Sequence, residues 1–166
     1  MPRVMDEADL ILEANAEHAR TFDASLLPKE PARKLAVVAC MDSRLNVYAA
    51  LGLGTGDAHV VRNAGGLVTD DVVRSLMLSQ WTLGTREIVI VQHTDCGLMR
   101  IREDETRARI AAETGAEPPF ALGAFQDLDV SVRESISRLT ESPFIAHKSI
   151  RGFVYDVATG LLREVR

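Results

Sequence analysis

Cysteine is scarce in this sequence of 166 residues, which contains only Cys40 and Cys96. Two thiols cannot form a zinc site of four cysteines, and their separation excludes a C-x-x-C redox motif. In a secreted protein they would predict a single disulfide, whereas in a cytosolic protein such a pair is more typical of metal binding or catalysis. Both cysteines are therefore candidates for a functional role.

Long hydrophobic runs and clusters of basic residues are also missing from the sequence. No stretch approaches the ~20 apolar residues that a membrane helix needs, so we expect no membrane partner. The net charge of −5 and the scattered lysines and arginines argue against a nucleic-acid partner. The amino-terminal residues include no hydrophobic segment of signal-peptide length, so the expected location is cytoplasmic.

The residues that are present predict one globular domain over residues 1–166. Hydrophobic residues make up 46% and charged residues 26%, which is the balance of a folded globular protein. Residues 1–27 are expected to form an amino-terminal helical arm. Leu10, Ile11 and Phe22 belong to an apolar stripe along its helix, and the prolines that follow prevent the helix from continuing.

Strands and helices alternate along the rest of the chain. Apolar runs at 34–39 and 86–92 are typical of strands that are buried on both faces, as in a parallel sheet. The pattern therefore predicts an α/β fold with a central, mostly parallel sheet flanked by helices and a carboxy-terminal strand hairpin. The other expected elements are a strand at 59–61, helices at 46–51, 70–83, 96–109 and 128–139, and hairpin strands at 150–156 and 161–165.

A glycine-rich stretch from Gly52 to Gly56 raises the alternative of a nucleotide-binding domain. Asp57 stands where the third glycine of a dinucleotide fingerprint should be, and the stretch follows an expected helix rather than a strand. We therefore interpret it as a turn and expect no stabilisation by nucleotides.

Two polar motifs, Cys40-x-Asp42-x-Arg44 and His93-x-x-Cys96, follow the apolar runs of the two expected strands at 34–39 and 86–92. If the two strands are neighbours in one parallel sheet, their carboxyl ends open onto the same crevice, where ligands bind in such sheets. Thiolate sulfur and imidazole nitrogen are ligands that zinc prefers. Cys40, His93 and Cys96 are thus expected to bind one metal ion, with Asp42 and Arg44 beside it.

The role of Asp42 stays open between two arrangements. Three protein ligands leave a fourth position for water, as in catalytic zinc sites, whereas Asp42 as a fourth ligand would close the site. Arg44 can form a bidentate pair with Asp42 and hold it off the metal. Asp95, which lies next to Cys96, is considered for a role in orientation near the site but is not assigned a catalytic role.

These two motifs, together with Arg62-Asn63-Ala64-Gly65-Gly66 between them, resemble those of a β-class carbonic anhydrase in order and spacing. The resemblance extends from about Lys34 to Gly97, and the short chain is similar to the compact bacterial branch of that family. From Arg102 to Pro143 no motif supports it.

The resemblance implies a Zn²⁺ enzyme that reversibly hydrates carbon dioxide to bicarbonate and a proton, by attack of a zinc-bound hydroxide. Cys40, His93 and Cys96 would be the metal ligands, and the catalytic residues Asp42 and Arg44 would orient the water and gate the fourth zinc position. The family also implies a homodimer or homotetramer in which the amino-terminal helix lies across the partner. Alternatives are a carbonyl sulfide or carbon disulfide hydrolase on the same scaffold, and a non-catalytic, structural zinc-binding protein.

Overall fold

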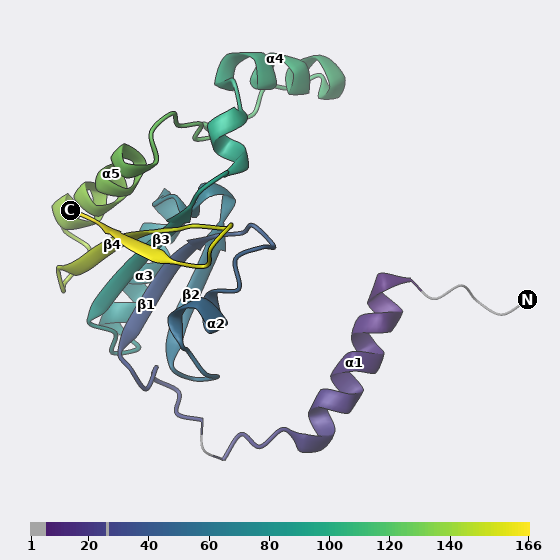
Figure 1. Cartoon of the computed structure of the whole chain (residues 1–166), viewed down its shortest axis with the longest axis vertical. Coiled ribbons are helices and arrows are strands. Elements are labelled where there is room, and N and C mark those ends of the chain that lie inside the picture. Colours follow the sequence, from purple (N-terminus) through teal and green to yellow (C-terminus); the bar gives the residue numbers. More distant parts are fainter. Residues whose placement is uncertain (1–5, 26) are drawn as a thin grey trace, which may run out of the picture.

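The computed structural model describes residues 6–25 and 27–166, and a five-stranded sheet lies at its centre (Figure 1). The strands are β1 (Leu35–Cys40), β2 (Ala58–Asn63), β3 (Glu87–His93), β4 (Ser149–Tyr155) and β5 (Leu162–Val165). Their order in the sheet is β2-β1-β3-β4-β5, and every pairing is parallel except that of β4 with β5. The predicted α/β fold with its carboxy-terminal hairpin is therefore confirmed.

Every residue of β1 is buried, because the strand lies inside the sheet and is covered on both faces. Ala36 and Val38 pack on the side of α3 (Asp70–Trp81) and α5 (Leu128–Glu141). Val37 and Ala39 face a second cluster that includes residues of α2 (Val47–Leu51). The continuous apolar run is thus the signature of a strand between two layers, as expected.

Capping side chains set the starts of these helices. Thr69 accepts the backbone N–H of Val72 at the start of α3, and Asn46 accepts that of Ala49 at the start of α2. Such caps satisfy N–H groups that have no partner within the helix. They place both helices close behind the carboxyl ends of β1 and β2.

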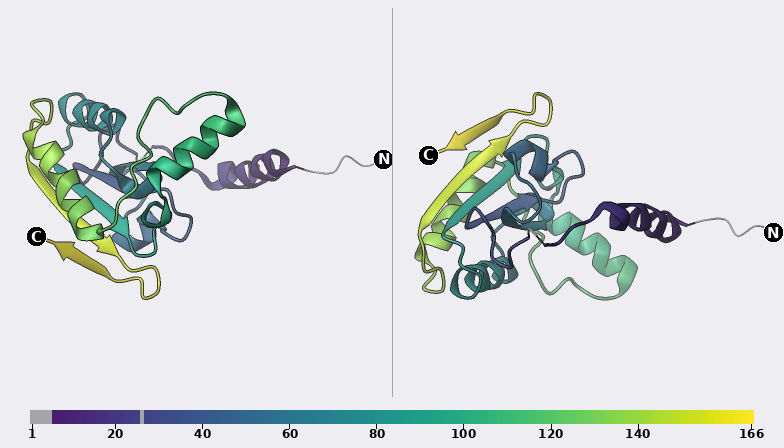
Figure 2. Two further views of the ribbon diagram at one scale, coloured as in Figure 1. Left: turned by 90° about the horizontal axis from the view of Figure 1, so that it is seen from above. Right: turned by 90° about the horizontal axis from the view of Figure 1, so that it is seen from below.

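The helix expected at 96–109 is wrong as a continuous element. The segment instead forms a short 3-10 turn, η2 (Gly97–Arg100), then extended backbone at Ile101 and Arg102, then α4 (Glu103–Thr114). Ile101 is partly buried against the core beside β1, whereas α4 has no buried residue and projects from the body (Figure 2). The break lets the chain leave the core at this point.

β2 is longer than the strand expected at 59–61. Arg62 and Asn63 continue it beyond that range, and the 3-10 turn η1 (Ala64–Gly66) follows directly. Parallel pairing of Ala39 with Arg62 and of Cys40 with Asn63 extends the sheet to the end of β1. The polar character of these residues reflects their place at the edge of the functional site.

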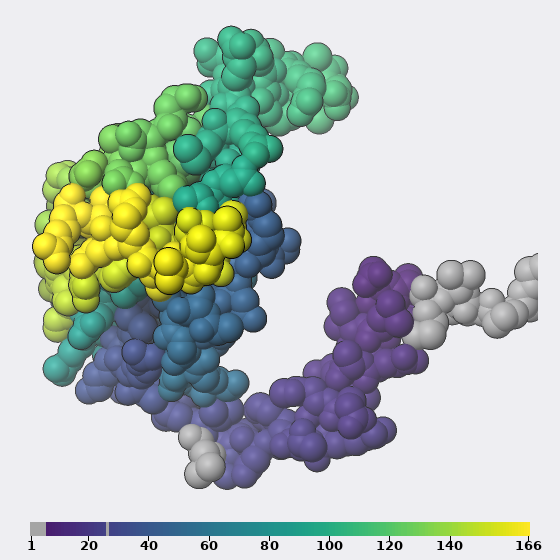
Figure 3. Space-filling view, in the orientation of Figure 1, coloured from purple at the N-terminus to yellow at the C-terminus, as the bar shows by residue number. Residues whose placement is uncertain are grey.

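The amino-terminal helix α1 (Glu7–Thr21) stands apart from the sheet at the end of an extended segment (Figures 1 and 3). It has no buried residue, and the side chains of Leu10, Ile11 and Phe22 are 47%, 65% and 50% exposed. The predicted helix is confirmed. Across the described ranges, 6–25 and 27–166, no helix combines the length and apolar character needed to cross a membrane.

Candidate metal centre

Cys40, His93 and Cys96 come together at the carboxyl edge of the sheet. Cys40 ends β1, His93 ends the neighbouring parallel strand β3, and Cys96 lies just before η2. Their ligand atoms all lie within 4.8 Å of one another, and all three residues are buried. The structure thus brings together the three residues that the sequence predicts as metal ligands.

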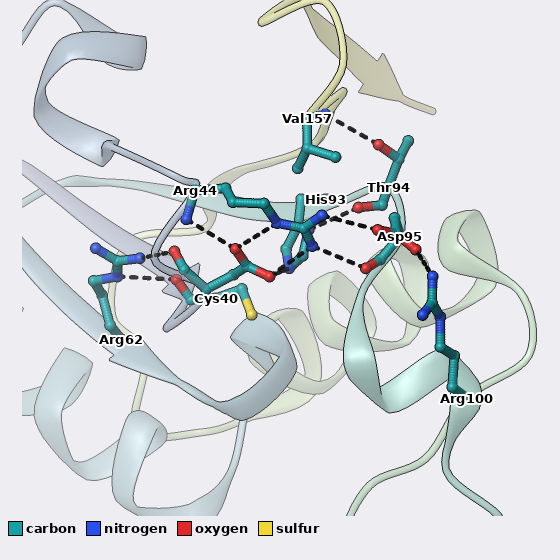
Figure 4. A network of polar contacts seen from close by, with 9 residues as sticks. Cys40, Arg44, Arg62, His93, Thr94, Asp95, Arg100 and Val157 are labelled. Carbon is teal, nitrogen blue, oxygen red and sulfur yellow. Dashed lines mark hydrogen bonds and ion pairs between the residues drawn. The ribbon is translucent and has the colours of Figure 1, made fainter.

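The imidazole of His93 has one nitrogen engaged and one free. Its Nδ1 lies 2.8 Å from the carbonyl oxygen of Thr94 and donates a proton to it (Figure 4). This bond leaves Nε2 as the nitrogen with a lone pair. Nε2 is fully buried and has no hydrogen-bond partner among the residues that the structure describes, a costly arrangement that a metal ion would relieve. The donor set of two sulfurs and one nitrogen fits zinc.

The two thiols differ in acidity. Burial raises the pKa of Cys40, but the imidazole of His93 and the backbone N–H groups of Asp42 and Gly65 outweigh burial and lower it to about 7. Burial raises the pKa of Cys96 above its ordinary value, with a further contribution from the neighbouring Cys40. Cys40 is therefore the thiol that becomes a thiolate more readily.

Asp42 and Arg44 form a bidentate ion pair next to the ligand cluster. The Nε and Nη2 of Arg44 lie 3.0 and 2.8 Å from the two carboxylate oxygens of Asp42, and its backbone N–H donates to Oδ1 as well. These bonds keep the pKa of Asp42 well below its usual range, so the carboxylate is ionised. Asp42 Oδ2 lies 3.7 Å from the Nε2 of His93, beside the free lone pair.

Two further residues, Arg62 and Asp95, hold this arrangement, although neither is among the catalytic and metal-binding residues predicted from the sequence. Arg62 donates from Nε to the carbonyl oxygen of Cys40 and from Nη2 to that of Asp42 (Figure 4). Asp95 accepts hydrogen bonds from Arg44. Their signal in the sequence is their place at strand ends, since Arg62 lies on the strand next to β1 and Asp95 lies between two ligands.

The glycines of η1 let the backbone pass directly over the ends of β1 and β3. Gly66 has a φ of +62°, and a Cβ on it would lie 2.8 Å from the backbone nitrogen of Cys40 and 3.0 Å from the carbonyl oxygen of Val91. Only glycine fits such a close approach without displacing its neighbours. η1 thereby forms one wall of the site.

A cavity of about 260 Å³ opens at the ligand cluster and the carboxylate of Asp42. Its apolar lining comes from Met41, Ala64, Leu98 and Ile101, among others. A larger cavity, of about 510 Å³, lies between α5 and residues 120–123 and includes none of the ligand residues. The smaller cavity is the one that contains candidate metal ligands and the Asp42 carboxylate, and it offers room for a small apolar molecule.

The sequence and the structure of the chain are similar to those of known proteins. A family model described as carbonic anhydrase matches residues 35–117. "Beta-carbonic anhydrase 1" of Mycobacterium tuberculosis is 48% identical over 97% of this chain and 99% of its own length. The crystal structure of carbonic anhydrase from Streptococcus mutans covers 99% of this chain and 100% of its own, with a TM-score of 0.93 and 43% identity. A carbon disulfide hydrolase of Acidithiobacillus thiooxidans is 40% identical over 79% of this chain and 76% of its own length.

Proposed function

The chain belongs to the β-carbonic anhydrase family, and from this we propose that it binds one Zn²⁺ through Cys40, His93 and Cys96 and interconverts carbon dioxide and bicarbonate. One observation carries the proposal. Three buried ligand atoms lie within 4.8 Å of one another, and the Nε2 of His93 has no other partner. When bound, zinc supplies Lewis acidity, which lowers the pKa of water from 15.7 towards about 7 where the ligands are neutral.

Asp42 is the residue that orients the reacting water. Its carboxylate is ionised, lies beside the ligand cluster and lines the cavity that would hold the substrate. An ionised carboxylate accepts hydrogen bonds but donates none. Asp42 would therefore accept a hydrogen bond from the reacting water and direct an oxygen lone pair towards the carbon of carbon dioxide.

Arg44 holds Asp42 in the orientation for this role. Both carboxylate oxygens are engaged by the guanidinium, which favours an Asp42 that stays off the metal. Release of this pair would free Asp42 to become the fourth ligand of a closed form. The pairing also argues against a purely structural zinc site, because such a site needs no group that holds a potential ligand away.

Carbon disulfide hydrolysis is the second candidate function, because a relative of that name is 40% identical to this chain. Carbon dioxide and carbon disulfide are both small, linear and uncharged. The apolar side chains of Met41, Leu98 and Ile101 offer neither of them a hydrogen bond. Carbon dioxide ranks first because the relative that matches almost the whole chain is named a carbonic anhydrase.

The experiment that tests the proposal is stopped-flow carbon dioxide hydration with zinc-quantified protein. We expect turnover that scales with bound zinc and rises from neutral to alkaline pH, because two thiolate ligands offset the charge of the metal and leave the water less acidic. Carbon disulfide is assayed in parallel with the same protein. Full zinc occupancy without carbon dioxide turnover would favour the hydrolase if carbon disulfide is consumed, and a structural zinc site if it is not.

The arm that carries α1 favours a homodimer or homotetramer as the working assembly. Leu10 and Ile11 are exposed on a helix that has no buried residue, Phe22 is exposed at its end, and burial against a second copy would cover all three. Residues 1–166 would then form one domain whose arm, residues 1–27, packs on the partner subunit. A cytoplasmic location stays a prediction.

A further inference from the structure

Arg44 lies between two aspartates, Asp42 and Asp95, and the proposed mechanism uses only Asp42. On its other side, Nη1 donates to Oδ2 of Asp95 at 2.8 Å, and Nη2 donates to the carbonyl oxygen of Asp95 at 3.1 Å (Figure 4). Together with the two bonds to Asp42, the guanidinium is held along two of its edges. Arginine presents its N–H donors in a fixed plane, so these contacts restrict both its position and its tilt.

The backbone of Asp95 is in an unusual conformation that makes this double contact possible. Its φ is +55°, in the left-handed region that few residues other than glycine adopt. In this conformation its carboxylate and its carbonyl oxygen both reach the same guanidinium. Such strained residues cluster at functional sites, where the surrounding structure holds them in place.

The turn that carries Asp95 is tied to the sheet. The backbone N–H of Thr94 donates to the carbonyl oxygen of Tyr155, and the Oγ1 of Thr94 accepts the N–H of Val157. The carbonyl oxygen of Thr94 accepts the Nδ1 proton of His93. Asp95 is therefore fixed relative to the imidazole of His93.

Arg62 holds the backbone of Asp42, but the side chains of Asp42 and Arg44 lie two residues apart in the same loop and are paired with each other. Their side chains could move together without breaking the pair, because Arg44 is 45% exposed. The contact with Asp95 spans 51 residues of sequence and joins this loop to the turn between His93 and Cys96. On its outer side, Asp95 also accepts the guanidinium of Arg100.

From this geometry we infer that Asp95 is a positioning residue for the reaction, which anchors Arg44 and through it fixes Asp42 relative to the metal ligands. The inference rests on the proposed function, because it assigns Asp95 to the same site. Asp95 does not touch the substrate cavity and is not a catalytic residue. It acts through Arg44, with Arg100 neutralising its second oxygen.

The test uses zinc-loaded protein with measured metal content and two variants, Asp95→Asn and Asp95→Ala. Asparagine tolerates the left-handed backbone but has only one acceptor oxygen and no charge, so it cannot hold both guanidinium groups. Alanine removes the acceptor altogether. We expect kcat to fall on the order of tenfold for asparagine and up to a hundredfold for alanine, as displaced catalytic groups do. KM and zinc content should stay at wild-type values.

A second readout reports the anchoring itself. Solvent exchange of the Arg44 Nε–H, followed by NMR in the zinc-loaded protein and assigned by its loss in Arg44→Ala, should become faster in both variants. The matched control is Asp129→Asn, because Asp129 forms a bidentate pair with Arg163 of β5, belongs neither to the ligand cluster nor to the lining of its cavity, and is similarly exposed. This control should leave both kcat and the exchange rate unchanged.

Wild-type values of either readout in both Asp95 variants would overturn the inference. A wild-type protein without carbon dioxide hydration would count against the proposed function instead. The exchange rate of the Arg44 Nε–H would then still decide whether Asp95 anchors this side chain.

Discussion

The Nη2 of Arg62 lies 2.8 Å from the carbonyl oxygen of Asp42, while the Nε of the same side chain lies 2.9 Å from that of Cys40. A residue of β2 thus holds the backbone that carries both a proposed metal ligand and the proposed orienting carboxylate. The residues that follow β1 are therefore held by β2, even though these residues lie outside the sheet.

Arg62→Met should destabilise the zinc-loaded protein by about 2 kcal/mol, because two carbonyl groups lose a charged hydrogen-bond donor. Methionine keeps an unbranched side chain but has no N–H group. The change is measured as the free energy of unfolding in urea. Arg33→Met serves as control, since Arg33 makes one exposed bond of 3.3 Å to Gly52, and we expect a change within about 0.5 kcal/mol. Equal losses in the two variants would contradict the role of Arg62.

Asp42→Asn and Arg44→Ala should leave zinc bound and lower kcat by roughly 10²–10³-fold, the usual effect of removing a positioned hydrogen-bond acceptor or its support. Neither side chain belongs to the Cys40, His93 and Cys96 cluster, so metal content should be unchanged. Metal analysis and stopped-flow turnover on the same samples give both values. Turnover at the wild-type level in either variant would remove the pair from the mechanism.

The affinity of the metal-free protein for zinc should rise with pH. Cys40 and Cys96 must both lose a proton to bind metal, and each proton released makes the affinity change about tenfold per pH unit. The pKa of Cys96 is raised, so zinc still displaces its proton at pH values above 7. Cys40 has a pKa of about 7, so zinc displaces its proton mainly at pH values below 7. The slope should therefore be steeper below pH 7 than above. Competition with a chelator of known affinity between pH 6 and 9 measures it, and a pH-independent affinity would refute the thiolate assignment.

Gly66→Ala should destabilise the protein far more than Gly115→Ala. Both glycines have positive φ, +62° and +74°, so alanine pays a similar backbone penalty of about 1–2 kcal/mol at each. A Cβ at Gly66 collides with the backbone of Cys40 and Val91, whereas one at Gly115 meets nothing within 4 Å. Overpacking adds about 1–3 kcal/mol to the first variant alone. The difference between the two variants in the free energy of unfolding in urea measures the cost of the contact between a Cβ at residue 66 and the backbone of Cys40 and Val91. Equal losses of stability in the two variants would contradict this contact.

Ile11→Asp should weaken the proposed assembly without unfolding the protein. Ile11 is 65% exposed in the single chain, so a carboxylate there costs the isolated fold little, but it would be buried against a second copy. Sedimentation velocity of wild type and variant measures the change in mass. Glu13→Asp, on the same exposed helix, is the control that adds no charge. An unchanged oligomer in Ile11→Asp would place the interface elsewhere.

The sequence was sufficient to predict the strands and the meeting of Cys40, His93 and Cys96, because both follow local rules. The apolar run at Leu35–Cys40 predicts a doubly covered strand, and parallel neighbours must present their carboxyl ends at one edge. Cys40 and His93 therefore had to lie near each other once β1 and β3 were adjacent. The order of the strands in the sheet could not be derived in this way and was assumed.

What could not be predicted depends on contacts between distant residues. Arg102 to Arg109 has the charge pattern of an exposed helix, but Glu103 binds the backbone N–H groups of Leu122 and Ala124, about twenty residues further on. Likewise, nothing local indicates that Asp95 pairs with Arg44. Such contacts are visible only once the chain is folded.

The bonds between Glu103 and the returning chain make α4 a closed loop on the surface. Arg107, one turn further along, donates to the carbonyl oxygens of Pro118 and Phe120, so the two ends of the excursion are fastened together near the body. Its far end, at Gly115, is exposed. A fluorescent label or affinity tag inserted at Gly115 would lie at the exposed end of a segment whose base is fixed by hydrogen bonds. We therefore expect the geometry of the ligand cluster to be unchanged by the insertion. The turn at Gly115 is thus a suitable site for attaching the enzyme to a surface.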